Sequence, residues 1–132
     1  MSCKNNDDFN VMKTLQKKPV ILIVDDDENI LYALREVLMN DGFSFLEAKD
    51  GMQAVEKIKV HQPNILIMDV DMPNMNGLDA VKQIRKFNPV VKIIIMTANG
   101  LDGYKQKFSD LMIHDYLSKP LSVNSIRSIL RT

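Results

Sequence analysis

Asp69 is the residue whose position most clearly suggests chemistry, because it directly follows the apolar run 65–68. A carboxylate at the end of a buried strand lies where the chain leaves the interior and can meet a ligand. Asp25 and Asp26 follow another apolar run, 20–24, in the same way. Ligands of open α/β sheets bind outside the carboxyl ends of the strands, so we expect the three carboxylates to share one site.

Three ionised carboxylates that lie a few ångströms apart repel one another. At about 5 Å and an effective dielectric constant of about 20, each pair costs roughly 3 kcal/mol. A hard cation such as Mg²⁺ removes this repulsion, and it binds through one or two carboxylates, water and a phosphate oxygen. The sequence therefore predicts a metal site. For Asp27, which immediately precedes a predicted helix, we prefer helix capping instead.

Two further side chains extend the predicted site. Thr97 ends the apolar run 93–96, and Lys119 precedes Pro120 after the last predicted strand. Taken singly, Lys119 is an ordinary surface lysine and Thr97 an ordinary strand-end residue. Together with acids and a metal, they suit a phosphoryl group. A carboxylate can attack phosphorus to form an acyl phosphate, while metal and lysine neutralise the charge that develops on the oxygens.

The elements that must position these side chains alternate along the chain. Short apolar runs predict strands, and apolar residues at helical spacing predict helices. The predicted strands are 20–24, 43–48, 65–68, 93–96 and 113–117, and the helical segments are 30–38, 54–58, 78–84, 101–112 and 123–130. Strands that are apolar at consecutive positions require a parallel sheet covered on both faces. We therefore predict a three-layer α/β fold.

Length and composition set limits on function. The 132 residues fit one domain, and 17 basic against 17 acidic residues give no basic excess that would favour nucleic acid. The apolar runs are far shorter than the ~20 residues of a membrane span. Residues 1–10 lack the apolar stretch of a secretion signal, and the single cysteine, Cys3, cannot form an internal disulfide. We expect a cytoplasmic protein without direct nucleic acid or membrane binding.

Residues 1–19 are predicted to be a separate tail, and residues 20–132 the folded domain. Phe9, Met12 and Leu15 of the tail could form one face of a short helix. An isolated helix of this length is marginal, so a tail without regular structure is an equal alternative.

Five short motifs stand in a specific order and spacing. They are Val24-Asp25-Asp26, Met68-Asp69, Met72-Pro73-Asn74-Met75-Asn76-Gly77, Met96-Thr97-Ala98 and Lys119-Pro120-Leu121. On these motifs the chain resembles the receiver domain of bacterial two-component response regulators, from about residue 20 to residue 131. The resemblance implies a flavodoxin-like receiver fold, with a doubly wound five-stranded parallel sheet in the order 2-1-3-4-5.

The resemblance also implies roles for individual residues. Asp69 would accept a phosphoryl group from a sensor histidine kinase or a histidine phosphotransfer protein. Asp26, Asp69 and the backbone carbonyl of Asp71 would coordinate Mg²⁺, and Asp25 would act largely through a metal-bound water. Lys119 and Thr97 would each hold one phosphoryl oxygen, and the Lys119-Pro120 peptide bond would be cis.

The same resemblance implies an output. Tyr116 would be an aromatic switch that turns inward behind Thr97, and the changed face would comprise the segments 101–112, 113–117 and 123–130. It would act on a downstream protein or on an output domain outside this chain. Asp71 and Asn99 occupy positions that in this family tune the loss of the phosphoryl group.

Two alternatives stay open on the sequence. Asp69-Val70-Asp71 also resembles the nucleophile motif of haloacid-dehalogenase-type phosphatases, although that family places its acid pair after this motif rather than before it. A receiver-fold scaffold that is never phosphorylated is the other alternative. In the preferred interpretation the chain is no enzyme beyond self-catalysed phosphoryl transfer and autodephosphorylation at Asp69.

Overall fold

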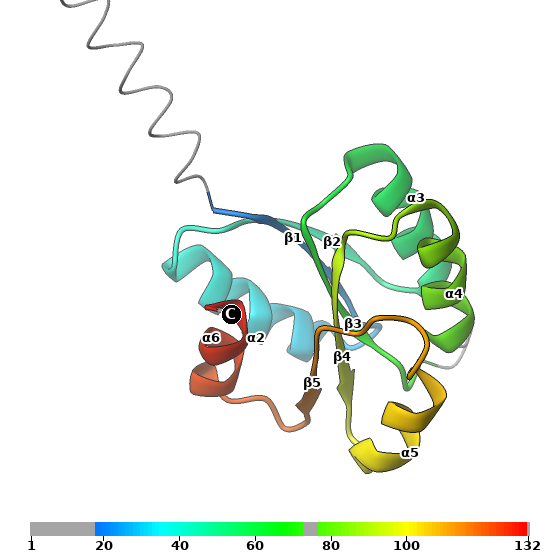
Figure 1. The fold of residues 1–132 in the computed structure, drawn as a ribbon. Helices are drawn as coiled ribbons and strands as arrows, with labels where there is room; N and C mark the ends of the chain where they lie inside the picture. Colours follow the sequence, from blue (N-terminus) through cyan, green and yellow to red (C-terminus); the bar gives the residue numbers. More distant parts are fainter. Residues whose placement is uncertain (1–17, 73–76, 132) are drawn as a thin grey trace, which may run out of the picture.

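The computed structural model describes residues 18–72 and 77–131, which form a five-stranded parallel sheet with helices on both faces (Figure 1). The strands are β1 (Val20–Val24), β2 (Ser44–Ala48), β3 (Ile65–Asp69), β4 (Lys92–Thr97) and β5 (Asp115–Ser118). The helices are α2 (Glu28–Asn40), α3 (Gly51–His61), α4 (Gly77–Phe87), α5 (Leu101–Lys107) and α6 (Val123–Leu130). The strand order is β2-β1-β3-β4-β5, which confirms the predicted fold.

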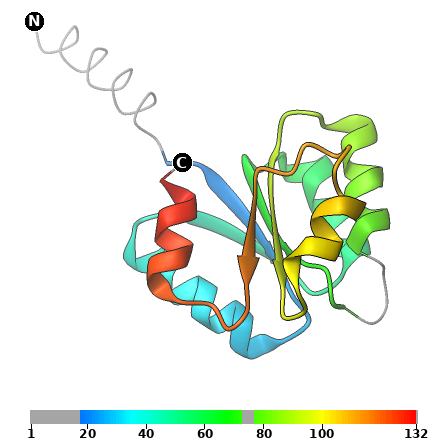
Figure 2. The same cartoon turned by 60° about the horizontal axis from the view of Figure 1, so that its bottom comes forward.

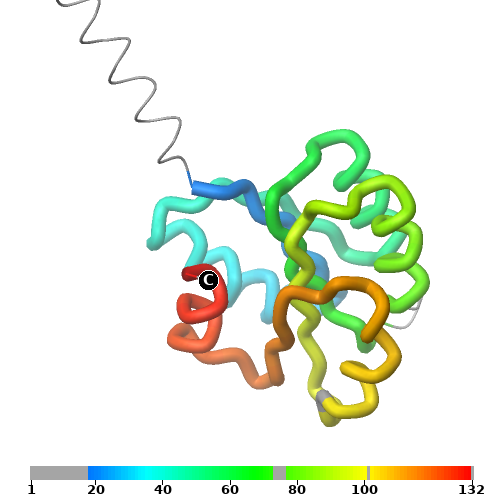
Figure 3. Tube along the Cα trace, in the orientation of Figure 1, coloured from blue at the N-terminus to red at the C-terminus, as the bar shows by residue number. Residues whose placement is uncertain are grey.

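Three layers follow from the burial of consecutive strand residues. In β1, Leu22 and Val24 pack in the cluster on the side of α3, α4 and α5, whereas Ile21 and Ile23 pack with α2 and α6. All four are fully buried, as expected for a strand with helices on both faces. The chain trace and a second view show the same division, with α2 and α6 together on one side (Figure 3; Figure 2).

Polar side chains cap the helices α2 and α6, and Asp27 does so as the sequence predicted. The Asp27 carboxylate accepts the Asn29 N–H at 2.9 Å and caps α2. Ser122 caps α6 by accepting the Ser125 N–H at 3.0 Å. Asn76 precedes the predicted helical segment 78–84, and the sequence predicts that it caps this helix, but it lies outside the described residues.

The segment after α5 differs from the prediction, because the helix expected over 101–112 ends at Lys107 and β5 begins at Asp115. Arg85 of α4 donates to the backbone carbonyls of Leu111 at 2.7 Å and Met112 at 2.8 Å. Met112 has a φ of 55°, which no α-helix accommodates. Contacts with another helix therefore override the helical spacing of the apolar residues.

Within the described residues, none of the helices combines the length and apolar character that a membrane span requires. Most of the predicted tail falls outside these residues, so the division into 1–19 and 20–132 stays a prediction.

Candidate functional site

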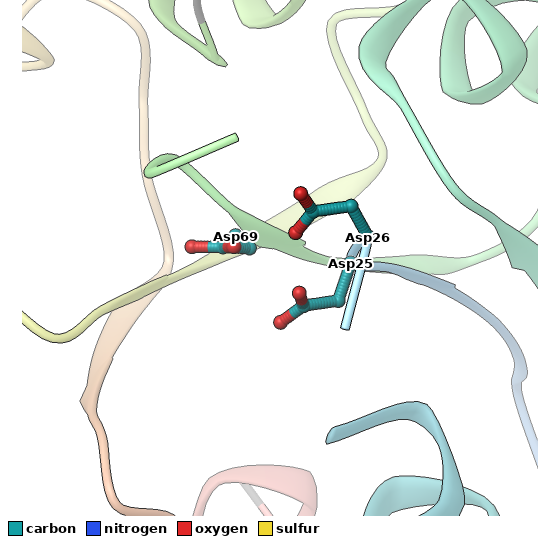
Figure 4. Close-up of side chains that lie close together, drawn as sticks. All are labelled: Asp25, Asp26 and Asp69. Carbon is teal, nitrogen blue, oxygen red and sulfur yellow. The ribbon is translucent and has the colours of Figure 1, made fainter. Parts of the chain in front are cut away.

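Three carboxylates gather at the carboxyl ends of β1 and β3 (Figure 4). Asp25, Asp26 and Asp69 each offer one oxygen, and these oxygens lie within 4.8 Å of one another. The two strands are neighbours in the sheet, with Val24 paired to Met68, so the residues that follow them meet. Asp25 and Asp69 are 0% and 2% exposed, whereas Asp26 is open to solvent. The cluster is therefore buried at Asp25 and Asp69 and exposed to solvent at Asp26.

Lys119 brings a positive charge to the buried side. Its Nζ atom lies 2.9 Å from Oδ2 of Asp25 and 3.2 Å from Oδ2 of Asp69. The backbone N–H of Lys119 donates to the Thr97 carbonyl at 2.9 Å, and the Lys119-Pro120 bond is cis, as the resemblance implied. These contacts place the lysine between two carboxylates.

The electrostatics of this ion pair follow from burial. Burial raises the pKa of Asp25 above its ordinary value, and the hydrogen bond from Lys119 opposes that shift only in part. Burial alone would lower the pKa of Lys119, but the Asp25 hydrogen bond and the Asp69 charge outweigh it and raise this pKa. Lys119 therefore stays protonated at neutral pH, while two buried carboxylates share one cation.

Thr97 lies at the site, but its hydroxyl is engaged by a different acid from Asp69. It donates to Oδ2 of Asp71 at 3.0 Å. The same carboxylate accepts the Ala98 N–H at 2.9 Å, the Asn99 side-chain amide at 3.3 Å and the Tyr104 hydroxyl at 2.8 Å. The backbone N–H of Asp71 in turn donates to the Asp69 carboxylate at 3.0 Å. Asp71 thus joins the acid cluster to the loop after β4.

The hydrogen bonds of this network favour a charged acceptor at Asp71. Burial raises the pKa of Asp71, but the hydrogen bonds from Ala98, Tyr104, Thr97 and Asn99 more than offset it and hold this pKa below its usual value. The bond to the Asp71 carboxylate raises the pKa of the Tyr104 hydroxyl. At neutral pH, Asp71 is therefore an ionised carboxylate that accepts the hydrogen bond, and Tyr104 a neutral hydroxyl that donates it.

The contacts of the Asp71 side chain and the participation of Tyr104 were not predicted from the sequence. The resemblance gave Asp71 a backbone carbonyl for the metal and a position that tunes the loss of the phosphoryl group, but no hydrogen-bond partners. One signal was available, because Asp71 and Asn99 each stand two residues beyond a predicted site residue on neighbouring strands. Tyr104 left no such signal. Its contact depends on where α5 lies.

Tyr116 lies half-buried in β5, paired with Ile95 of β4. It packs against the cluster on the α3, α4 and α5 side of the sheet. The Nζ atom of Lys105 in α5 lies 5.6 Å from the centre of its ring. The ring therefore sits between the sheet and the surface of α5.

The family model of the response regulator receiver domain matches residues 21–131 of this chain. The chain belongs to the response regulator receiver family. It is 36% identical over 107 residues to the chemotaxis protein CheY of Thermotoga maritima, covering 80% of this chain and 89% of that protein. Over 111 residues it is 30% identical to the sporulation initiation phosphotransferase F of Bacillus subtilis, covering 84% and 90%.

Solved receiver structures agree with this membership. The CheY-like receiver domain protein of Methanospirillum hungatei superposes with a TM-score of 0.81 at 24% identity, covering 88% of this chain and 92% of that one. CheY4 of Vibrio cholerae gives 0.78 at 27% identity, covering 87% and 98%. The first supports the fold alone.

The relatives differ in total length. The alkaline phosphatase synthesis transcriptional regulatory protein PhoP of Bacillus subtilis is 33% identical over 115 residues, and this chain spans only 48% of it. The chain is thus a phosphoacceptor receiver domain of the two-component type. The matched region makes up 89% of the relative CheY and 48% of the relative PhoP. Receiver domains are signalling domains that bind Mg²⁺ at an acidic cluster and interact with histidine kinases or phosphotransfer proteins. The haloacid-dehalogenase alternative is not supported.

Proposed function

We propose that this receiver domain accepts a phosphoryl group on Asp69 from a phosphohistidine of a sensor kinase or phosphotransfer protein. The observation that carries the proposal is the position of Asp69 at the end of β3, with the Lys119 ammonium 3.2 Å from its Oδ2 atom and two further acids beside it. Beyond this self-catalysed transfer and the later loss of the group, the domain turns over no substrate.

The donor set fits Mg²⁺. Three carboxylates with one lysine leave a net negative charge, and their hard oxygens are the ligands that Mg²⁺ prefers. Asp26, Asp69 and the backbone carbonyl of Asp71 would hold the ion, and Asp25 would bind one of its waters. The bound ion would neutralise phosphoryl oxygens as charge develops on them.

The chain's own residues carry the transfer. An Asp69 carboxylate oxygen attacks phosphorus, the phosphorus–nitrogen bond of the phosphohistidine breaks, and the imidazole leaves with the electron pair and takes up a proton. Lys119 holds one phosphoryl oxygen from its place between Asp25 and Asp69. Thr97 holds another once its hydroxyl is released from Asp71.

Incubation with acetyl phosphate and Mg²⁺ tests this function against its competitors. We expect one acid-labile phosphoryl group per chain and no steady turnover of a phosphomonoester. Sustained hydrolysis of a phosphomonoester would instead identify a phosphatase. A folded chain that acquires no phosphoryl group from small donors or from a kinase would support the unphosphorylated scaffold.

The output we propose is a change in the face formed by α5, β5 and α6. Phosphorylation draws the Thr97 hydroxyl toward Asp69, and Tyr116 turns into the vacated space. The position of the Tyr116 ring between the sheet and Lys105 supports this, since its rotation alters the surface of α5 directly.

Thr97→Ala is expected to uncouple this face from the site, because the methyl side chain cannot donate to a phosphoryl oxygen. Amide chemical shifts recorded with and without beryllofluoride, a phosphoryl mimic, should change over residues 101–118 in the wild-type protein and change much less in the variant. Shifts of equal size in both proteins would mean that Thr97 does not transmit the signal.

We further propose that the protein is cytoplasmic and that its partner is a downstream protein or an output domain. These residues are not expected to bind nucleic acid or membranes directly. The balanced charge of the chain supports the last point.

A further inference from the structure

The Asp71 carboxylate connects two hydroxyl groups that belong to different parts of the molecule. One is that of Thr97 at the end of β4, and the other is that of Tyr104 in α5. The Ala98 N–H and the Asn99 amide complete the set of donors. Four donors on one carboxylate favour its charged form and fix its position. We call this set, Asp71 with Thr97 and Tyr104, the Asp71 latch.

In the unphosphorylated state the latch engages the Thr97 hydroxyl, which is proposed to donate to a phosphoryl oxygen after phosphorylation. A hydroxyl group carries one proton, and it can be donated to one acceptor at a time. The Thr97 oxygen lies 3.0 Å from Asp71 and 3.1 Å from the Asn99 carbonyl, and the carboxylate is the stronger acceptor. A phosphoryl oxygen on Asp69 can therefore accept the hydrogen bond of the Thr97 hydroxyl only if Asp71 no longer accepts it.

The other end of the latch tethers the N-terminal part of α5. This helix begins at Leu101, and its N-cap residue, Gly100, makes no side-chain cap; a Cβ atom built on Gly100 or Gly103 would meet no atom within 4 Å. Its C-terminal side is held more firmly, by Phe108, which is 1% exposed, and by the bond from Arg85 to Leu111. Release of Tyr104 would thus free the end of α5 that faces the site.

We propose that the Asp71 side chain is a positioning group that holds the unphosphorylated state, and that phosphorylation of Asp69 opens the latch and releases Tyr104. This rests on the proposed function, because it needs a phosphoryl group at Asp69. A phosphoryl oxygen would accept the hydrogen bond of the Thr97 hydroxyl in place of Asp71. The phosphoryl group would also add negative charge near the Asp71 carboxylate, which lies two residues along the chain from Asp69. Both effects weaken the latch. The coupling to α5 through Tyr104 is separate from the turning of Tyr116.

A contact made only in the unphosphorylated state can be distinguished by experiment from a contact made in both states. Removing a contact made only in the unphosphorylated state makes the phosphorylated arrangement easier to reach. Removing a contact made equally in both states changes stability and leaves that equilibrium alone. The affinity for a phosphoryl mimic therefore separates the two possibilities.

The test compares Tyr104→Phe with the wild-type protein and with Tyr32→Phe as a matched control. The first change removes the hydroxyl and keeps the ring beside Phe108, whose centre lies 6.4 Å away. Tyr32 is 58% exposed in α2, so its hydroxyl should not matter. We expect the beryllofluoride concentration that half-saturates the protein, with Mg²⁺ present and amide shifts as the readout, to fall about threefold to tenfold in Tyr104→Phe.

A half-saturation equal to that of the wild type and of Tyr32→Phe would overturn the latch while leaving phosphorylation of Asp69 intact. A wild-type protein that shows no response to beryllofluoride would instead overturn the proposed function, and the latch with it. The two failures are distinguishable.

A second measurement needs no variant of the latch. In the wild-type protein, hydrogen exchange of the α5 amides that donate within the helix, those of residues 104–107, is expected to become faster on saturation with beryllofluoride. Exchange in α5 that is unchanged or slower would overturn the proposal, even if Tyr104→Phe proved too unstable to study.

Discussion

Asp69→Asn is expected to abolish covalent labelling by acetyl phosphate and Mg²⁺ while the protein stays folded. The amide has nearly the same shape as the carboxylate and can still accept the Asp71 N–H, but it cannot form the acyl phosphate. Lys119 keeps its contact with Asp25 at 2.9 Å, so the cation is not left unpaired. Intact-protein mass spectrometry measures the loss, and circular dichroism checks the fold.

Asp27→Asn is the matched control for this experiment. Asp27 belongs to the same run of acids, but its side chain caps α2, and asparagine caps equally well. This variant should label like the wild type. Labelling of Asp69→Asn to the wild-type stoichiometry would assign the chemistry to another residue.

Asp26→Ala is expected to remove most of the stabilisation that Mg²⁺ confers. A cation that binds only the folded chain raises stability by mass action, by about 2.7 kcal/mol at one hundred times its dissociation constant. Asp26 supplies one of the three clustered carboxylates. Because this side chain is exposed, its loss leaves no cavity and should not harm the metal-free protein. Removing this carboxylate also relieves its repulsion with Asp25 and Asp69, which should stabilise the metal-free protein slightly. The effect is small because solvent screens an exposed charge.

Melting temperatures over a Mg²⁺ titration measure this effect in the variant, in the wild type and in Asp27→Asn. The melting temperatures of the wild type and of Asp27→Asn should rise by the same amount as Mg²⁺ is added, and that of Asp26→Ala should change little. A variant whose melting temperature rises as much as that of the wild type would show that the cation binds elsewhere on the protein.

Much of the fold could be predicted because burial on both faces leaves a direct trace in the chain. β1 was predicted at its observed bounds, 20–24, since helices on both sides leave no position for a polar residue within it. The convergence of Asp25, Asp26 and Asp69 also needed β1 and β3 to be neighbours, which the family resemblance implied and the structure shows. Strand ends thus carried the information about the acid cluster.

What could not be predicted depends on contacts between loops and helices. The Asp71 side chain reaches Thr97 and Tyr104 only because α5 is placed beside the end of β4, and no periodicity in the sequence encodes that placement. The early end of α5 has the same origin, since Arg85 of another helix binds the carbonyls that follow it. Long-range hydrogen bonds of single side chains decide both features.

The position of the acyl phosphate is the most direct test of the assigned phosphoacceptor. Reduction with borohydride converts a phosphorylated aspartate to homoserine, and peptide mass spectrometry then locates the change. After treatment of the wild-type protein with acetyl phosphate and Mg²⁺, we expect homoserine at position 69 and unchanged aspartate at Asp25, Asp26 and Asp71. Homoserine at any of those three residues with Asp69 unchanged would contradict the site proposed from this structure.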